Sequence, residues 1–484
     1  MMKLKLVVVA AFCSVSAVFC TPLDDYVHLP DSHYEYNEAW QPYVDDRMTI
    51  YYLNMTSQKW LTEAELNRPI WWHIMCVIVP HDVKYDQHAF MYITGGGNHN
   101  EKPSLSDKEL SLISAYSLST KMIGAILHQI PNQPLTFTND PLNKSRSEDA
   151  IIALTWYKFL EDTERPEWLL RLPMTKAAVR ALDTITDVVM KKKSLSISKF
   201  FVAGASKRGW TTWTTAAVDK RVVGITPIVL DVINVQDNFR HIWHSYGNWS
   251  FALEDYYDMN VTLRLFDPAF EKLAAIVDPI AYADRLTMPK YIISTTGDEF
   301  QMPDDTLFYG RTLPGKTYYR MIPNAEHSCA GHAVSIFLGL QAFFISIVEN
   351  SPLPPLNWTM TRNAEGGSIT LHSPTKPSSV TMWHGTTIDG NFRRDFRLLC
   401  ASKDSSKPTI HPVFWKGNSV SQNNNGEYVA EMKNPREGWS AFFIQVTYPA
   451  PFSDVMMFTT QVNIIPETFP YPDCHGEGCR GNLI

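Results

Sequence analysis

Short apolar runs alternate with stretches of helical spacing over residues 21–350. Continuous apolar runs, rich in β-branched and aromatic residues, are typical of strands buried on both faces of a sheet. The clearest helical spacing covers residues 175–190. This alternation predicts a mainly parallel, doubly wound α/β sheet with helices on both faces. The predicted strands of this part are 48–53, 71–79, 89–94, 124–130, 199–203, 222–230, 289–295 and 318–322.

The alternation breaks down over residues 232–278, where aromatic side chains crowd together. We interpret this segment as a helical cap inserted into the sheet domain. Its aromatic side chains are expected to form the buried face of the cap, with the wall of a substrate cleft as the alternative. His241 and His244 share one face of a helix, but the sequence places no third ligand beside them, so we predict no metal site.

A different period begins after residue 355. Seven runs alternate apolar and polar residues at period two between turn residues, which predicts an antiparallel β-sandwich-like domain over residues 356–470. A proline-rich linker at 351–355 separates it from the α/β part, and residues 471–484 form a tail. The sandwich carries no cluster of catalytic residue types, so a supporting role is expected. The runs are 368–372, 379–383, 396–400, 412–415, 428–432, 440–448 and 457–465.

Composition narrows the class of protein. The chain has 484 residues, 45% of them hydrophobic and 19% charged, with a formal net charge of −7. These values are ordinary for a globular protein, and the longest basic run, 191–193, is expected to end a helix. We therefore predict no nucleic-acid partner and no cofactor.

The N-terminus has the features of a signal peptide. Lys3 and Lys5 precede an apolar run over residues 6–19, and Cys20 ends an acceptable cleavage site. The run is short for a membrane span, and no later stretch reaches the roughly 20 apolar residues that a span requires. We predict a signal peptide over residues 1–20 and a secreted or extracellular protein, with the endolysosomal lumen as the other compartment and a signal anchor as the alternative.

Two of the seven cysteines fall in this signal peptide. Cys474 and Cys479 close a short glycine-rich loop, which predicts a local disulfide in an oxidising compartment. A zinc site would need a second pair of ligands, which this loop lacks. Cys329 is a candidate to pair with Cys76 or Cys400, leaving one thiol free.

Five Asn-x-Ser/Thr sequons become candidate glycosylation sites in a secreted chain, and each one that is used must be exposed. They are Asn54, Asn143, Asn248, Asn260 and Asn357.

A serine between two glycines follows the apolar run at 199–203. Gly204 and Gly209 supply the space that a sharp strand-to-helix turn needs, so Ser206 has the setting of a nucleophile elbow. The spacing is G-x-S-x-x-G rather than G-x-S-x-G, and an ordinary turn is the competing interpretation. A helix beginning after Ser206 would direct backbone N–H groups at a developing oxyanion.

An acid and a histidine follow in the order expected of a Ser-acid-His triad. Asp298 comes directly after the strand at 289–295, and His327 lies in the loop after the strand at 318–322. Serine needs a base within hydrogen-bond reach and a third group that orients the base. Asp304 is an alternative acid, although we expect it to cap the helix that begins near Thr306.

A three-glycine turn after the strand at 89–94 is the candidate for the second oxyanion donor. Gly96 and Gly97 allow close approach of the backbone, and Lys207, which follows the nucleophile, supplies the first donor. A flexible hairpin is the other interpretation of the glycines. For the side chains of Lys207 and Arg208 we expect a salt-bridged role, with Glu326 as a partner.

The elbow over residues 204–213, the Gly-Asp-Glu-Phe run at 297–300 and the Pro-Asn-Ala-Glu-His loop at 323–327 resemble the PhoPQ-activated pathogenicity-related family, which includes secreted autocrine proliferation repressors. The resemblance covers residues 36–470. It implies an α/β-hydrolase fold and a triad of Ser206, Asp298 and His327, with no known substrate. The elbow also resembles that of glucuronoyl esterases, and this second resemblance makes Asp231, after an earlier strand, a rival to Asp298.

These features predict a secreted serine hydrolase that acts on an ester or a peptide-like amide of a small molecule or peptide. The alternative is a secreted signalling protein that uses the hydrolase scaffold to bind a cell-surface receptor without catalysis.

Overall fold

A computed structural model gives the structure of residues 20–99, 101–402, 407–450 and 453–484. Apart from Cys20, the predicted signal peptide therefore lies outside the described residues. None of the helices in the described ranges has the length and apolar character that a membrane span requires.

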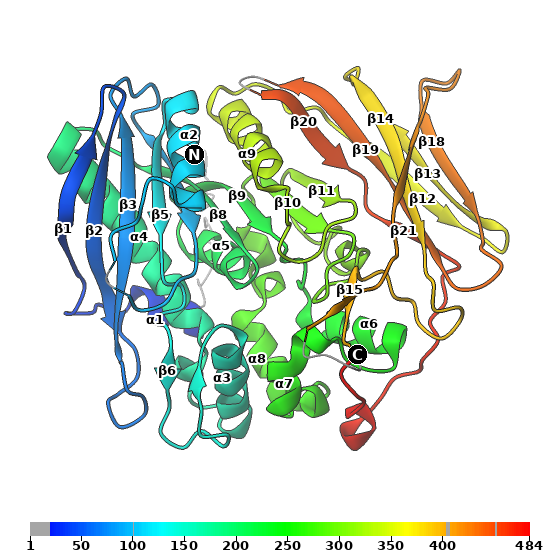
Figure 1. Ribbon diagram of the computed structural model, residues 1–484, viewed down its shortest axis with the longest axis horizontal. Helices are drawn as coiled ribbons and strands as arrows, with labels where there is room; N and C mark the ends of the chain where they lie inside the picture. Colours follow the sequence, from blue (N-terminus) through cyan, green and yellow to red (C-terminus); the bar gives the residue numbers. More distant parts are fainter. Residues whose placement is uncertain (1–19, 100, 403–406, 451–452) are drawn as a thin grey trace, which may run out of the picture.

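A mainly parallel sheet forms the centre of the molecule (Figure 1). Strands β5, β4, β8, β9, β10 and β11 lie in this order and run parallel, while β3, β2 and β1 extend one edge with antiparallel pairing. Their bounds are β1 (Glu35–Val44), β2 (Met48–Lys59), β3 (Ile70–Pro80), β4 (His88–Ile93), β5 (Ile123–Leu127), β8 (Lys199–Ala205), β9 (Val222–Ile228), β10 (Lys290–Thr295) and β11 (Thr317–Ile322), and the short β6 (Leu135–Thr136) and β7 (Ser145–Arg146) pair apart from the sheet.

Helices cover both faces of this sheet, which explains the continuous apolar runs. Along β4, Phe90 belongs to the core beneath α2 and α9, and its neighbour Met91 belongs to the core beneath α4 and α5. The predicted fold class is confirmed: this is the α/β-hydrolase arrangement. The helices are α1 (Pro22–His28), α2 (Lys108–Thr120), α3 (Asp149–Glu161), η1 (Pro166–Trp168), α4 (Arg171–Lys193), α5 (Lys207–Val218), η5 (Asp305–Phe308) and α9 (Ala333–Val348).

Short helices between β9 and β10 form the cap. Its aromatic side chains Phe239, Trp249 and Tyr256 are buried and pack toward α3. The cap therefore stands beside the carboxyl end of β8, where Ser206 lies. Its elements are α6 (Val235–Tyr246), η2 (Phe251–Leu253), α7 (Glu254–Asp258), η3 (Val261–Arg264), α8 (Pro268–Val277) and η4 (Pro279–Arg285).

The C-terminal strands continue the central sheet. Strand β20 pairs antiparallel with β11 at Thr459 and Tyr319, and β19, β14 and β17 follow outward (Figure 1). A second sheet, β12-β13-β18, packs against this extension, so the sandwich shares one of its sheets with the hydrolase part. The strands are β12 (Asn357–Arg362), β13 (Gly366–His372), β14 (Ser379–Thr386), β15 (Leu399–Cys400), β16 (Thr409–Ile410), β17 (Lys416–Ser419), β18 (Tyr428–Lys433), β19 (Ser440–Ala450), β20 (Ser453–Thr459) and β21 (Asn463–Ile465).

The tail returns to the cap. A disulfide joins Cys474 to Cys479 around η6 (Gly476–Cys479), and the backbones of Trp249 and Leu483 then form a parallel bridge. The backbone N–H of Ile484 donates to the carbonyl of Trp249 at 2.9 Å. These bonds hold the tail along one side of the cap.

The expected pairing of Cys329 is not formed. Cys76, Cys329 and Cys400 are free thiols. Their surroundings differ: Cys76 lies in the core within β3, Cys329 lines a cavity beside Ser206, and Cys400 donates its thiol proton to Asp395.

Candidate active site

Ser206 stands at the sharp turn between β8 and α5. Its φ of 56° and ψ of −131° lie outside the regions that residues with a side chain prefer. A Cβ on Gly204 would lie 2.7 Å from the carbonyl oxygen of Arg208, and one on Gly209 would lie 3.1 Å from that of Gly204. Only glycine fits where the strand and the helix approach so closely, and the turn fixes Ser206 at the end of the strand.

His327 and Asp298 meet Ser206 from the ends of two neighbouring strands. The Nε2 atom of His327 lies 2.8 Å from Oγ of Ser206, and Nδ1 lies 2.9 and 2.8 Å from the two carboxylate oxygens of Asp298. Because a carboxylate only accepts, Nδ1 carries a proton and Nε2 is left to accept the serine proton. Asp298 is 3% exposed, and the backbone N–H of Phe300 also donates to it.

Two carboxylates control the charge of His327. Burial disfavours the imidazolium, but the charge of Asp298 and its hydrogen bonds outweigh this, and the pKa of His327 is raised above its usual value. Glu299 accepts the backbone N–H of His327 at 3.1 Å. Burial, with the charge of Asp298, raises the pKa of Glu299 to about 7. The sequence contained Glu299 beside the candidate acid, but its bond to a residue of the next loop could not be found from spacing.

The rival acids have other partners. Asp231 is fully buried, accepts hydrogen bonds from the hydroxyls of Tyr309 and Ser294, and makes no bond to His327. Burial, with the charges of Asp298 and Asp304, raises the pKa of Asp231 to about 8, so its proton is retained near neutral pH.

Asp304 pairs with Arg394 at 2.5 Å. Its side chain makes no capping bond to η5, so the predicted cap is wrong. The buried guanidinium of Arg394 comes from a distant loop, and the sequence around Asp304 gives no indication of this partner.

The candidate oxyanion donors are only partly assembled around Ser206. Lys207 begins α5, so its backbone N–H is one of the donors at a helix N-terminus. Thr94 and Gly95 line the same cavity as Ser206, whereas Gly96 and Gly97 line neither cavity beside the nucleophile. A Cβ on Gly95 would lie 2.4 Å from the guanidinium of Arg208, which is held by the carbonyl of Ile130 and by Glu148, so a side chain here would displace these bonds.

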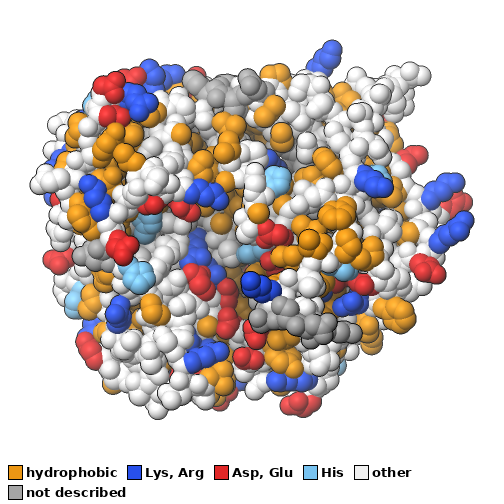
Figure 2. All heavy atoms as spheres, in the orientation of Figure 1, with side chains coloured by type: hydrophobic (Ala, Val, Ile, Leu, Met, Phe, Trp, Pro, Cys, Tyr) orange, Lys and Arg blue, Asp and Glu red, His pale blue; other side chains and the backbone are white. Residues whose placement is uncertain are grey.

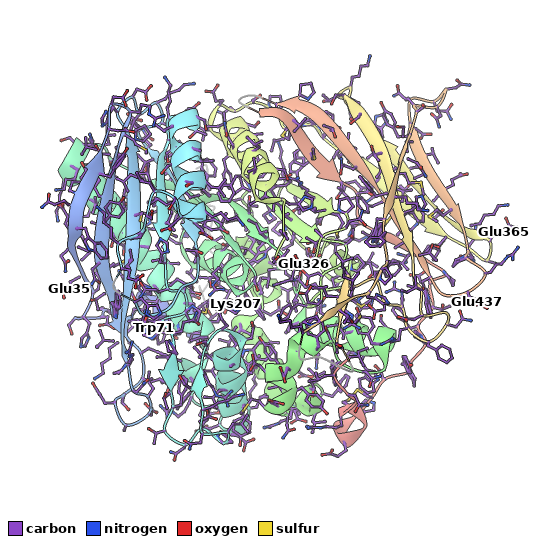
Figure 3. All side chains as sticks on the ribbon, viewed as in Figure 1. Glu35, Trp71, Lys207, Glu326, Glu365 and Glu437 are labelled. Atoms are coloured by element: carbon purple, nitrogen blue, oxygen red, sulfur yellow. A yellow bond between two sulfur atoms is a disulfide. The ribbon has the colours of Figure 1, made fainter. Side chains whose placement is uncertain are left out.

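Lys207 and Arg208 are salt-bridged, but not to Glu326. Lys207 is 7% exposed and contacts Glu148 at 3.0 Å and Asp149 at 2.8 Å, and Arg208 contacts Glu148 at 2.6 Å. Although burial alone would raise the pKa of Glu148, the charges of Arg208 and Lys207 lower it to about 2. Glu326 instead accepts from Ser328 in its own loop, so the predicted pairing is wrong. Figure 3 labels Lys207 and Glu326, which come from different segments of the ribbon.

Two cavities meet at Ser206 and His327. One of about 290 Å³ reaches the loop after β4 and helices α2 and α9, and its wall includes Lys108, Glu109 and Arg208. The other, of about 50 Å³, lies toward α3 and the cap, and its wall is mainly hydrophobic, with aromatic and aliphatic side chains; we call it the aromatic cavity. Figure 2 shows charged side chains gathered around a hollow near the middle of this face.

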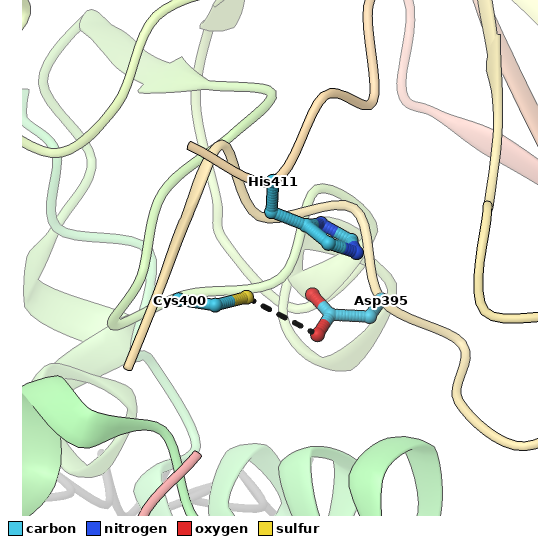
Figure 4. A group of neighbouring side chains, drawn as sticks. All are labelled: Asp395, Cys400 and His411. Carbon is cyan, nitrogen blue, oxygen red and sulfur yellow. Dashed lines mark hydrogen bonds between the residues drawn. The ribbon is translucent and has the colours of Figure 1, made fainter. Parts of the chain in front are cut away.

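In the part of the chain that the structure describes, two clusters contain the residue types that bind metals. In each of them an arginine side chain already pairs with a carboxylate. His241 donates from Nδ1 to Asp305 at 2.8 Å and accepts from Arg394 at Nε2 at 2.9 Å, so both ring nitrogens are used. In the other cluster, Figure 4 shows the thiol of Cys400 bonded to Asp395.

Arg397 covers both carboxylate oxygens of Asp395, at 3.0 and 2.6 Å. His411 lies between the carbonyl of Arg397, 2.8 Å from Nδ1, and the carboxylate of Asp389, 3.1 Å from Nε2. Both nitrogens therefore face acceptors, and the pKa of His411 is raised because the bond to Asp389 and the charge of Asp395 outweigh its burial.

The candidate glycosylation sites differ in exposure. Asn143, Asn260 and Asn357 are exposed, while Asn54 and Asn248 are partly buried. The side-chain oxygen of Asn248 accepts the backbone N–H of Asn482, so the tail occupies its surroundings.

Comparison with known proteins gives a consistent set of relatives. The family model described as PhoPQ-activated pathogenicity-related protein matches residues 23–397. Autocrine proliferation repressor protein A of Dictyostelium discoideum is 36% identical over 498 aligned positions, which cover 99% of this chain and 98% of that protein.

Solved structures match at lower similarity. Acetyl xylan esterase 1 from a Thermoanaerobacterium species has a TM-score of 0.41 and 16% identity, covering 63% of this chain and 88% of that one. The glucuronoyl esterase of Solibacter usitatus has a TM-score of 0.38 and 12% identity, covering 64% of this chain and 86% of that one.

Proposed function

Because the chain belongs to the PhoPQ-activated pathogenicity-related protein family and has the α/β-hydrolase fold, we propose that it is a serine hydrolase acting on an ester or amide bond. One observation carries the proposal: Ser206 Oγ lies 2.8 Å from His327 Nε2 while Nδ1 faces both oxygens of Asp298. This is the hydrogen-bond geometry that an activated serine requires.

Each residue has a definite step in the proposed reaction. Ser206 Oγ attacks the carbonyl carbon as its proton passes to His327 Nε2, and the carbonyl oxygen takes up the negative charge. The backbone N–H of Lys207 and the loop after β4 at Gly95 would stabilise that oxyanion. The bond to the leaving group breaks, and His327 returns the proton to the leaving oxygen or nitrogen.

The acyl group is then bound to Ser206 and is released by the reverse use of the same residues. His327 takes a proton from water, the water oxygen attacks the acyl carbon, and the bond to Ser206 Oγ breaks as the proton returns to serine. The products are a carboxylic acid and an alcohol or amine. Asp298 would hold the imidazole in the required tautomer throughout both halves.

We also propose that the protein is secreted. The predicted signal peptide over residues 1–20 and the exposed sequons at Asn143, Asn260 and Asn357 support this compartment. The tail disulfide between Cys474 and Cys479 is of the kind that persists in an oxidising environment.

The relationship to a protein named autocrine proliferation repressor protein A, over nearly the whole chain, supports a second candidate. In this alternative the protein binds a cell-surface receptor and represses proliferation without catalysis. The two candidates make opposite predictions for Ser206→Ala in a proliferation assay: the signalling candidate retains full activity in the variant.

The test of catalysis is labelling of the purified protein with a fluorophosphonate probe. Wild-type protein should label, Ser206→Ala should not label at all, and Asp298→Asn should label up to about 10⁴-fold more slowly. Ser335→Ala, on α9, is the matched serine control and should label as wild type does. Absence of labelling in folded wild-type protein would reject the hydrolase proposal.

A further inference from the structure

The two cavities beside the nucleophile differ in size and in chemistry. Both include Ser206 and His327 in their walls, so a substrate bound at the serine reaches into both. A carbonyl group attacked by Ser206 has an acyl side and a leaving-group side, and each side needs its own space. The size and lining of each cavity therefore indicate which kind of group each half of the substrate contains.

The cavity toward the cap suits a small, uncharged group. Its wall includes Trp156, Trp210 and Phe300, and the charges at its edge, Asp149 and Lys207, are paired with each other at 2.8 Å. A charged group placed there would lose water without gaining a free partner, which is unfavourable. The volume is about 50 Å³, against about 290 Å³ for the other cavity.

The cavity toward α2 and α9 suits a larger, polar group. Its volume is about 290 Å³, well above the roughly 150 Å³ of a protein cavity that holds benzene. Lys108 and Arg208 bring two positive charges to its wall, Glu109 brings a negative charge, and Ser328 brings a hydroxyl. A polyhydroxylated or otherwise polar group would find donors and acceptors on this side.

The second half of the reaction decides which side takes the acyl group. Water that releases the acyl group must approach His327 through the space that the leaving group has left. Water is held where it finds polar partners, and the larger cavity offers more of them than the smaller one does. The leaving group therefore belongs in the polar cavity and the acyl group in the aromatic one.

From these observations, and resting on the proposed hydrolase function, we infer that the substrate is a short-chain acyl ester or amide of a larger polar alcohol or amine. The acyl chain has about two to four carbons, because the aromatic cavity has a volume of only about 50 Å³. Hydrolysis adds water across the acyl bond and releases a short carboxylic acid and the polar alcohol or amine.

Acyl chain length is the property to test. For 4-nitrophenyl esters of the full chain, kcat/KM should fall at least about tenfold from the acetate or butyrate to the octanoate, since single methylenes change binding in apolar pockets by this order. Leu253→Ala, which enlarges the aromatic cavity from the cap, should raise the octanoate-to-acetate ratio at least about fivefold. Phe337→Ala, in the wall of the other cavity, is the matched control and should leave this ratio unchanged.

The short-acyl inference and the hydrolase proposal can fail separately. Fluorophosphonate labelling of Ser206 together with a preference for octanoate would overturn the short-acyl inference and leave the hydrolase proposal standing. A change of the ratio in Phe337→Ala but not in Leu253→Ala would reverse the assignment of the two sides. If the protein does not label, the hydrolase proposal fails first. If Leu253→Ala does not fold, Ile242→Ala enlarges the same cavity from helix α6 and serves the same purpose.

Discussion

His327 lies between two carboxylates that act on different parts of it. Asp298 accepts from the ring and Glu299 accepts from the backbone N–H. Since the pKa of Glu299 is raised to about 7 by burial and by Asp298, Glu299 gains its charge in the pH range in which the imidazole must lose its proton. The negative charge of Glu299 in turn raises the pKa of His327.

Replacing Glu299 with glutamine should move the acid limb of the pH profile of kcat/KM to lower pH. The amide oxygen can still accept the backbone N–H, but the negative charge is gone, so the pKa of His327 falls and more of the neutral base is present below pH 7. Hydrolysis of 4-nitrophenyl acetate between about pH 5 and pH 8 measures the limb.

The control is Glu326→Gln, which removes a carboxylate from the loop that carries His327. This carboxylate accepts hydrogen bonds from Ser328 and not from His327. It should leave the limb near its wild-type position. A limb that moves to higher pH in Glu299→Gln would contradict the role given to this carboxylate.

At the residue level, the sequence predicted the groups whose position depends on local chain geometry. Ser206 could be found because its turn demands Gly204 and Gly209, and Asp298 and His327 because each follows a strand. Glu148 could not be found, because its bonds to Lys207 and Arg208 join helix starts that are distant in sequence. Contacts of this kind depend on the packing of whole elements.

Among the elements, the cap is held to the loop that follows β10 by a buried ion pair. Arg394, in the loop after β14, bonds both to His241 on α6 and to Asp304, which precedes η5. Arg394 is 3% exposed and Asp304 is fully buried. The pKa of Asp304 is lowered because the charge of Arg394 outweighs its burial. This pair ties together three segments that are far apart in the chain.

Arg394→Met should therefore lower the free energy of unfolding by about 3–5 kcal/mol, because Asp304 would remain buried without its partner. Its neighbour Arg393 provides the matched control: it pairs with Asp389 at 3.4 Å and is 30% exposed. Arg393→Met should cost about 0–1 kcal/mol. Urea unfolding measures the free energy of unfolding of both variants. Equal losses in the two would show that the buried pair stabilises the fold no more than the exposed pair does.

The elements that the sequence missed include one whose pattern is not set by burial. Strand β1 has no buried residue along its length, so it lacks the apolar signal of the inner strands. The predicted strand at 412–415 is wrong: Val413 and Trp415 are buried, but in an irregular segment before β17. Because alternate residues are buried there, the sequence has the same alternating pattern as a half-buried strand.

In the whole molecule, the hydrolase part and the C-terminal strands share both a sheet and a core. The rings of Tyr318 on β11 and Phe458 on β20 lie 4.5 Å apart, and the hydroxyl of Tyr291 donates to the carbonyl of Met457 at 2.7 Å. Helix α9 packs on β20 as well as on the central sheet. The linker at 351–355 therefore does not separate two independent cores.

We accordingly predict a single cooperative unfolding transition for the full chain. Calorimetry should give one endotherm with a calorimetric enthalpy close to the van't Hoff enthalpy, because neither part can open without exposing the core of the other. Phe458→Ala should lower the temperature of the whole transition. Two resolved transitions, of which Phe458→Ala shifts only one, would instead identify two independently stable domains.

The division of the site between separate elements has a consequence for the history of such a protein. The aromatic cavity is built by α3 and the cap, and the polar cavity by α2, α9 and the loop after β4, while the serine, acid and histidine stand on the sheet between them. Under the proposed function, substitutions on one side would alter which substrate group is accepted there without moving Ser206, Asp298 and His327 or the opposite side. Descendants of one ancestor could then diversify in two directions while they keep the proposed reaction.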